Sequence, residues 1–317
     1  MSTITGPELV PAKMHLATPV SPVTGTVVKN ERCTANGKAA GVVRHIEFDV
    51  SGTPLAGSFV SGQSFGVLPP GVDANNKPHK LRLYSLSSPT TGEDGKGNIV
   101  ATTVKRTIDE HWDTGKLFLG VCSNYLCDCQ PGDKVQLTGP SGKRFVLPQR
   151  ADEHDYVFVA TGTGIAPFRG MLLDLLNNQS TRKPNIALLM GSPYATDLLY
   201  HKDLLALAEQ YKNFHYITAI SREKQSDGKP AMYVHDRLTL NADTLRPILE
   251  SDRGLIYMCG IAGMELGVLQ KLTNLPQAAR EQYIEADAET LANPQSWTRQ
   301  MLHKQVKPTR RVFMEVY

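Results

Sequence analysis

The chain lacks the long apolar runs that membrane proteins require. Nowhere in its 317 residues does an uninterrupted apolar stretch approach the roughly 18–20 residues of a membrane-spanning helix. Its first twenty residues contain no arginine and no apolar core behind a basic start, so neither a secretory signal nor a transit peptide is predicted. We therefore expect a cytoplasmic protein with reduced thiols, a compartment that also suits the odd number of cysteines, five.

Strong charge of either sign is also absent. The 34 Lys and Arg residues nearly balance the 31 Asp and Glu residues, and no dense basic run occurs, which argues against a nucleic-acid partner. The chain has no internal repeat and no low-complexity tract. Its nine histidines show no metal-ligand spacing, so we predict no metal site.

Three of the five cysteines nevertheless cluster in VCSNYLCDCQPG (121–132). Cys122 and Cys127 have the first spacing of a plant-type [2Fe–2S] site, but Cys129 comes one residue too early. Cys33, a candidate fourth ligand, lies in an unrelated strand region. No second pair suits zinc, and a disulfide is disfavoured in a reducing compartment. We therefore predict no sulfur-based site here.

The first half of the chain has the pattern of an antiparallel β structure. Short stretches that alternate apolar and polar residues are separated by Gly, Pro and Asn turns, which favours a β-barrel or sandwich. We place this domain at residues 18–150, after an extension at 1–17. The predicted strands are GTVVKN, RHIEFDV, SFGVLPPG, LRLYSLSSP, IVATTVKR, KVQLTGPSG and RFVLP.

After a polar, Pro-containing boundary at 148–155, strands alternate with helices. This alternation predicts a parallel sheet covered on both faces over residues 151–317, with any ligand beyond the carboxyl ends of the strands. We expect Asn241 to cap one of the helices. The predicted strands are 156–160, 186–190, 215–220 and 254–260, and the predicted helices are 168–176, 201–211, 241–250 and one from about 262.

A glycine turn, TGTGIAPFRG (161–170), follows the first of these strands and opens a helix. Gly162 and Gly164 would let the backbone approach a pyrophosphate, and a helix N-terminus favours an anion. Pro167 suits a first helical turn but replaces the last glycine of the GxGxxG fingerprint. A tight turn without a ligand is the alternative.

Two further stretches carry groups suited to a nucleotide. Ser221 and Arg222 end a strand where an NAD site would have an acidic residue, so we predict a 2′-phosphate partner, with Tyr233 as a candidate adenine contact. In RLYS, Arg82 and Tyr84 share one strand face. Taken alone, however, such residues are usually solvent-exposed.

In combination, the motifs resemble the plant-type ferredoxin–NADP+ reductase family, from about residue 20 to the last residue. GVCSNYLCD and YMCGIAGME are specific to the plant-type branch. The motifs are, in order, GQSFGVLPPG, RLYSLSSP, VKR, GVCSNYLCD, GPSGK, ATGTGIAPFRG, GSPYATDLLYHKDL, ISRE, MYV, YMCGIAGME and the final MEVY.

The resemblance implies noncovalent FAD in the barrel and NADP(H) on the second domain. Arg82 would hold the FAD pyrophosphate, Tyr84 and Tyr317 would cover the two faces of the isoalloxazine, and Ser85 would bond near N5. The implied FAD contacts are Arg82, Leu83, Tyr84, Ser85, Thr103, Val104, Lys105, Val121, Cys122, Ser123, Thr163 and Tyr317.

The same resemblance implies the NADP(H) contacts and the catalytic residues. Cys259 and Glu315 would lie where nicotinamide meets flavin, Glu315 supplying protons and Cys259 packing. The implied catalytic residues are Ser85, Cys259, Glu315 and Tyr317. The implied NADP(H) contacts are Lys105, Thr163, Gly164, Ser192, Pro193, Ser221, Arg222, Tyr233, Gly260, Ile261 and Glu315.

Two departures from the family pattern matter. Ala231 stands where members usually carry a second lysine for the 2′-phosphate, and Lys229 lies two residues earlier, so weaker preference for NADPH is expected. Asp109 stands where members tend to have an aromatic that stacks on the FAD adenine, and Trp112 is a candidate substitute.

The expected function is electron transfer between NADP(H) and a ferredoxin or flavodoxin. The alternatives are the reductase component of an oxygenase system, such as the benzoyl-CoA epoxidase type, or a flavin-free NADP-binding regulator. The intact RLYS, GVCSN and final Tyr317 argue against the regulator.

Overall fold

The computed structural model describes residues 6–317, so the first five residues of the expected extension 1–17 lie outside it. The chain divides into two compact units. We call residues 10–147 with 166–174 the barrel unit, and residues 6–9, 148–165 and 175–317 the sheet unit. Within residues 6–317, no helix is both long enough and apolar enough to cross a bilayer.

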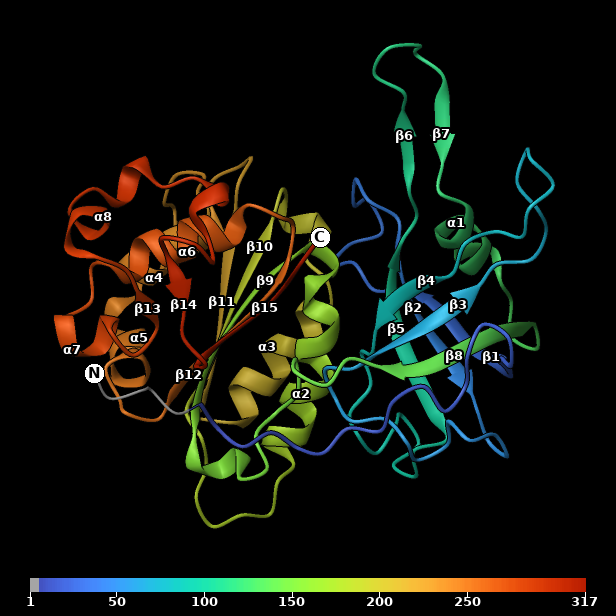
Figure 1. The fold of residues 1–317 in the computed structure, drawn as a ribbon, viewed down its shortest axis with the longest axis horizontal. Helices are drawn as coiled ribbons and strands as arrows, with labels where there is room; N and C mark the ends of the chain where they lie inside the picture. The colour runs from blue at the N-terminus through green and yellow to red at the C-terminus, as the bar shows by residue number, and fades with distance from the viewer. Residues whose placement is uncertain (1–5) are drawn as a thin grey trace. The chain divides into compact units, whose positions relative to one another are not determined.

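The barrel unit is built on a six-stranded antiparallel sheet (Figure 1). Its ends approach each other through a bridge between Leu86 and Thr102 and a hydrogen bond from Ser87 N to Ala101 O (2.8 Å). Its core includes fully buried Ile46, Phe48 and Phe65. The order is β4 (Arg82–Ser85), β3 (Ser64–Leu68), β8 (Lys134–Ser141), β1 (Val23–Arg32), β2 (Val43–Asp49) and β5 (Ile99–Lys105).

A two-stranded ribbon and a short helix follow β5 in the barrel unit. The ribbon pairs β6 (Ile108–Glu110) with β7 (Leu117–Leu119), and it projects from the barrel beside α1 (Val121–Asp128) in Figure 1. The chain leaves the ribbon at Leu119 and enters α1 only two residues later, so the two elements are directly joined.

The sheet unit contains a five-stranded parallel sheet with helices along both faces (Figure 1). The order is β11 (Phe214–Ile220), β10 (Ile186–Ser192), β9 (Asp155–Thr161), β12 (Gly254–Gly260) and β15 (Val312–Val316). The helices of the second half are α2 (Ile165–Leu176), α3 (His201–Gln210), α4 (Arg237–Leu240), α5 (Ala242–Leu249), α6 (Met264–Leu272), α7 (Gln277–Arg280) and α8 (Ala288–Ala292). Between α7 and β15 in the chain, the strands β13 (Ile284–Glu285) and β14 (Lys307–Pro308) form a small antiparallel pair.

The predicted fold class, an antiparallel β domain followed by a parallel-sheet domain, is confirmed. Three local predictions are wrong. RFVLP (144–148) is not a strand: its apolar residues are buried but pair with no strand of the six-stranded sheet, and only Pro148 makes an isolated bridge, to Leu9. The stretch from Val121, which the family resemblance implies is a loop along the FAD diphosphate, is helical instead. Asn241 occupies the N-cap position of α5, but its side chain makes no capping hydrogen bond.

Candidate functional site

The strand β4 and the helix α1 bring Arg82, Tyr84 and Cys122 together in the barrel unit. The Tyr84 hydroxyl hydrogen bonds with the Cys122 thiol, and the charge of Arg82 acts on both groups. Burial raises the pKa of Tyr84 and of Cys122, so both side chains stay protonated at neutral pH. The sequence separates these residues by about forty positions, yet they form one surface with a cation, an aromatic ring and a helix start.

The N-terminus of α1 is suited to an anion. Gly120 occupies the N-cap position and has no side chain to accept a hydrogen bond from the first turn. Val121, at the first helical position, is half exposed, and the Ser123 hydroxyl is held nearby, donating to Gly120 O (3.2 Å). The backbone N–H groups of this first turn, together with the Arg82 guanidinium, are hydrogen-bond donors that suit a diphosphate. Tyr84 offers a ring face beside them. The residues present therefore fit an FAD diphosphate.

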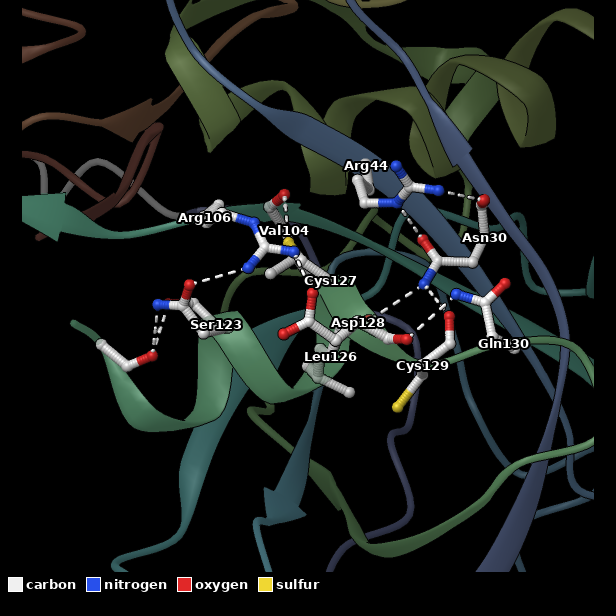
Figure 2. Close-up of polar contacts among 12 residues, drawn as sticks. Asn30, Arg44, Val104, Arg106, Ser123, Leu126, Cys127, Asp128, Cys129 and Gln130 are labelled. Atoms are coloured by element: carbon white, nitrogen blue, oxygen red, sulfur yellow. Dashed lines mark hydrogen bonds and ion pairs between the residues drawn. The ribbon is translucent and has the colours of Figure 1, made fainter.

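Polar side chains hold α1 in place by hydrogen bonds and an ion pair (Figure 2). Asn30 donates to the carbonyls of Leu126 (3.0 Å) and Cys129 (2.7 Å), which are free acceptors at the helix end. Arg106 pairs with Asp128 and donates to Asn124 Oδ1 (2.9 Å). The eight-residue helix is thus anchored at both ends, which orients its first turn.

Within residues 6–317, none of the five cysteines forms a disulfide. Cys122, Cys127 and Cys129 belong to the barrel core, so Cys129 has a packing role that the sequence did not indicate. The Cys127 thiol points to the carbonyl of Val104 at 3.9 Å. Burial raises the pKa of both Cys127 and Cys129 to about 11.

The other barrel residues of the implied FAD site differ in accessibility. Leu83 is exposed and Ser85 is partly buried, its carbonyl accepting from Thr102 Oγ1 (2.8 Å). Thr103 and Val104 are buried, so only their backbone remains for a ligand, whereas Lys105 at the end of β5 is exposed. The assignment of Lys105 to NADP(H) stays a prediction.

In the sheet unit, most of the implied nucleotide contacts follow the carboxyl ends of parallel strands. Ser192 is the last residue of β10 and is followed by Pro193. Gly260 is the last residue of β12 and is followed by Ile261. Ser221 and Arg222 directly follow β11. Backbone hydrogen bonds join two of these ends, from Ser221 N to Ser192 O and from Arg222 N to Pro193 O (both 3.0 Å). This edge is where ligands bind in open α/β sheets.

The glycines of this edge are required by packing. A Cβ on Gly164 would lie 2.0 Å from the carbonyl oxygen of Cys259, and one on Gly260 would lie 2.1 Å from Thr161 Oγ1. Gly260 also has φ +143°, and Gly162 has the left-handed φ +52°. Gly164 and Gly260 let the turn after β9 fit tightly against the end of β12, a reason that differs from the predicted approach to a pyrophosphate, whereas Gly162 is favoured by its φ alone.

Tyr317 is held by three hydrogen bonds. Its amide donates to Gly260 O (3.0 Å), its carbonyl accepts from Ala262 N (2.9 Å), and its hydroxyl bonds with Thr163 Oγ1 (2.7 Å). The side chain still has 65% of its surface exposed, so a fixed backbone presents an accessible ring.

Cys259 and Glu315 are direct neighbours in the register of β12 and β15. Cys259 is 1% exposed, and burial with the nearby Glu315 charge raises the pKa of its thiol. Burial likewise raises the pKa of Glu315 to about 7. A carboxyl group that changes protonation near neutral pH can give or take a proton, whereas the buried thiol stays protonated.

Beyond β11, Arg222 lies over the ring of Tyr194, with its guanidinium carbon 5.9 Å from the ring centroid. Tyr233 is exposed and stacks on His235 at 5.7 Å. Lys229, the candidate replacement for the lysine missing at Ala231, pairs instead with Asp227 at 2.7 Å. Lys229 therefore does not supply a free second cation in this loop.

The barrel unit contains a group of possible metal ligands that the sequence did not indicate. Among the described residues, it is the one such group, and ligand atoms of His45, Glu47 and Glu93 lie within 4.8 Å of one another. Arg169 already pairs with Glu93 (2.5 Å), and Lys29 pairs with Glu47 (3.4 Å). These cations balance the carboxylates, so we interpret the group as a structural charge cluster.

Sequence reasoning missed several supporting residues. Asn30 and Tyr194 carry no recognisable motif, so only the fold could identify their contacts. Asp227 could have been noticed, because an acid two residues from Lys229 is a ready partner. The strand β15, which positions Glu315, was also not predicted.

Comparisons with known proteins agree with this geometry. The family described as "Oxidoreductase NAD-binding domain" matches residues 158–270. A ferredoxin–NADP reductase of Spirulina sp. is 39% identical over 80% of this chain and 87% of its own length. The chloroplastic leaf isozyme 1 of Arabidopsis thaliana is 37% identical over 79% of this chain and 69% of its own length.

The fold also resembles that of a solved ferredoxin–NADP+ reductase. The solved structure of a ferredoxin–NADP+ reductase from Plasmodium falciparum superposes with a TM-score of 0.70, covers 96% of this chain and 99% of its own, and shares 21% identity. Because the sequence identity to the cyanobacterial and plant enzymes is well above 30% over most of both chains, the chain belongs to the plant-type ferredoxin–NADP reductase family.

Proposed function

We propose that this protein transfers electrons between NADP(H) and ferredoxin by means of noncovalently bound FAD. The observation that carries the proposal is the 37–39% identity to ferredoxin–NADP reductases over about four fifths of the chain. The donor set at Arg82 and α1 supports it, because those residues suit a dinucleotide flavin. The relatives do not favour the alternative of an oxygenase component.

In the barrel unit, Arg82 and the first turn of α1 would hold the FAD diphosphate, and Tyr84 would pack on the flavin ring. Ser85 would donate a hydrogen bond near flavin N5. When bound, FAD supplies the conversion between a two-electron hydride donor and one-electron acceptors. The protein's part is to bind the cofactor, to orient it and to keep water from its reactive edge.

In the sheet unit, the carboxyl edge binds NADP(H). Ser221 and Arg222 bind the 2′-phosphate, and Tyr233 packs on the adenine. Tyr194 holds the guanidinium of Arg222 from one side, which reduces the entropy lost when the phosphate binds. Thr163, Ser192, Pro193, Gly260 and Ile261 line the remaining length of the nucleotide.

Four residues act on the reaction itself. Glu315 exchanges protons with the reacting groups, which its pKa of about 7 permits. Cys259 packs against the nicotinamide as a protonated thiol. Tyr317 would cover one face of a bound flavin and would have to move for nicotinamide to reach it, and Ser85 would help to orient the flavin.

The proposed partners include flavodoxin as well as ferredoxin, and the proposed compartment is the cytoplasm. Flavodoxin is a second acceptor of the same electrons, since it too accepts them singly. The odd number of cysteines suits a reducing compartment, which we take to be the cytoplasm.

The test is the reduction of ferredoxin by NADPH, followed by cytochrome c reduction, with and without the organism's own ferredoxins and flavodoxins. A yellow protein that reduces cytochrome c only when a ferredoxin is added would support the proposal. A colourless protein, or one that is inactive with every ferredoxin and flavodoxin, would contradict it. Repetition with NADH measures the nucleotide preference.

A further inference from the structure

The ribbon of β6 and β7 exposes apolar side chains on both of its faces. Ile108, Leu117, Phe118 and Leu119 are each at least half exposed, and Trp112 in the turn is 98% exposed. A two-stranded ribbon that stands away from a sheet, as this one does in Figure 1, is marginally stable alone. Apolar surface on such a ribbon indicates that something covers it.

The register assigns each side chain to a face. Asp109 lies directly opposite Phe118, and these two side chains therefore share one face. The neighbouring pairs, Ile108 with Leu119 and Glu110 with Leu117, point to the other face. One face thus presents aliphatic groups, and the other presents the aromatic ring of Phe118 beside a carboxylate.

The base of the ribbon is fixed to the start of α1. Gly120 N donates to Thr107 O (3.0 Å), Thr107 N donates to Ser123 Oγ (3.2 Å), and Asn124 Nδ2 donates to Thr107 O (2.9 Å). A diphosphate at the first turn of α1 therefore has the ribbon as its neighbour. An adenosine attached to that diphosphate can extend along the ribbon.

The two candidate aromatic side chains differ in their place on the ribbon. Phe118 is three residues before Val121, roughly 10 Å along an extended strand, which leaves room for a ribose between phosphate and base. Trp112 lies in the turn, beyond the far ends of both strands. Adenine stacking needs a flat side chain within reach of the phosphates, and Phe118 meets this requirement.

We propose that Phe118 stacks on the adenine of FAD. It supplies from β7 the ring that Asp109 does not supply from β6. The inference rests on the proposed function, because it takes FAD as the cofactor. Trp112, the substitute expected from the sequence, has no part in the contact.

The test measures flavin affinity with the full-length chain freed of flavin. FAD and FMN are titrated against wild type, Phe118→Ala, Phe118→Tyr and Trp112→Ala by flavin fluorescence. FMN lacks the adenosine, so its Kd reports whether the rest of the site is intact. Phe118→Ala should raise the Kd for FAD about tenfold or more and leave the Kd for FMN within about twofold. Phe118→Tyr and Trp112→Ala should keep both values near those of wild type.

Three results would overturn the inference: an unchanged Kd for FAD in Phe118→Ala, an equal loss of FMN affinity in that variant, or a selective loss of FAD affinity in Trp112→Ala. Failure of the wild type to bind either flavin would be a different result. It would overturn the proposed function together with the inference.

Discussion

At the scale of single residues, the strand β15 carries two groups whose chemistry depends on where they are held. Glu315 lies beside Cys259 in the register, and Tyr317 is tied by its backbone to Gly260 and Ala262. Both positions are set by backbone hydrogen bonds, so side-chain substitutions there should change chemistry more than position.

Glu315→Gln should remove a pH-dependent loss of stability. The ordinary pKa of 4.5 is raised to about 7 in the folded protein, so the unfolded chain loses this proton first as pH rises. The wild type should therefore lose stability relative to the variant between about pH 4.5 and 7, by up to about 3 kcal/mol. Urea unfolding of both proteins across this range measures the effect.

Glu315→Gln should also change the pH dependence of catalysis. Reduction of ferredoxin by NADPH should change with pH near 7 in wild type, and Glu315→Gln should lack this inflection. Glu289→Gln, a change at an exposed glutamate in α8, is the control and should behave as wild type. If Glu315→Gln kept the wild-type pH dependence in both measurements, the assigned proton role would be wrong.

Tyr317→Ser should tighten NADP(H) binding and slow turnover. In the proposed mechanism the ring competes with nicotinamide for the flavin face, so its removal leaves the nucleotide unopposed and slows product release. We expect the Kd for NADP+ to fall about tenfold. Difference spectra with NADP+ give this value, and steady-state assays give kcat.

The matched control is Tyr317→Phe, which keeps the ring and loses only the bond to Thr163. It should resemble wild type in nucleotide affinity. Equal behaviour of the serine and phenylalanine variants would show that the hydroxyl, not the ring, matters.

At the scale of elements, we propose that the loop after β11 sets the preference between NADPH and NADH. In this proposal Arg222 is the cation for the 2′-phosphate, held over the ring of Tyr194. Lys229 pairs with Asp227, so we expect it to contribute less to a 2′-phosphate than an unpaired lysine would.

Ala231→Lys should therefore raise the preference for NADPH. A second cation beside the 2′-phosphate should increase the ratio of kcat/KM for NADPH to that for NADH about tenfold. Ala231→Met, which adds length without charge, should leave the ratio unchanged. An equal increase in both variants would mean that side-chain bulk, rather than charge, was responsible.

Most of the helices and strands could be predicted from the sequence, but some could not. Alternating patterns predicted most strands, because half-buried strands must alternate. RFVLP (144–148) misled because its apolar residues are buried by packing without joining the sheet. The helical stretch from Val121 was hidden because its stability depends on contacts from afar, namely Asn30 and Arg106.

The candidate site was predictable in part for a similar reason. Motif residues such as Arg82 and Ser221 stand out because their chemistry is visible in the letters. The facing of Phe118 and Asp109, or of Cys259 and Glu315, depends on strand register, which no local pattern specifies.

At the scale of the whole molecule, the two units should respond separately to their own ligands. Amide hydrogen exchange of the flavin-free chain should slow at α1 and the β6–β7 ribbon when FAD is added. Adenosine 2′-monophosphate should slow exchange at residues 221–233 instead, because binding suppresses local opening at the contacted segment. Protection of the same segments by both ligands would contradict separate sites.

The burial of four thiols, Cys122, Cys127, Cys129 and Cys259, bears on how long such an enzyme survives its own chemistry. A reduced flavin passes some electrons to dissolved oxygen, and the resulting hydrogen peroxide attacks exposed thiolates first. In VCSNYLCDC the thiols are buried, and their raised pKa values keep them protonated. If FAD binds at α1 as proposed, the stretch that resembled a redox centre would lie beside a redox cofactor with its thiols in the form least open to oxidation.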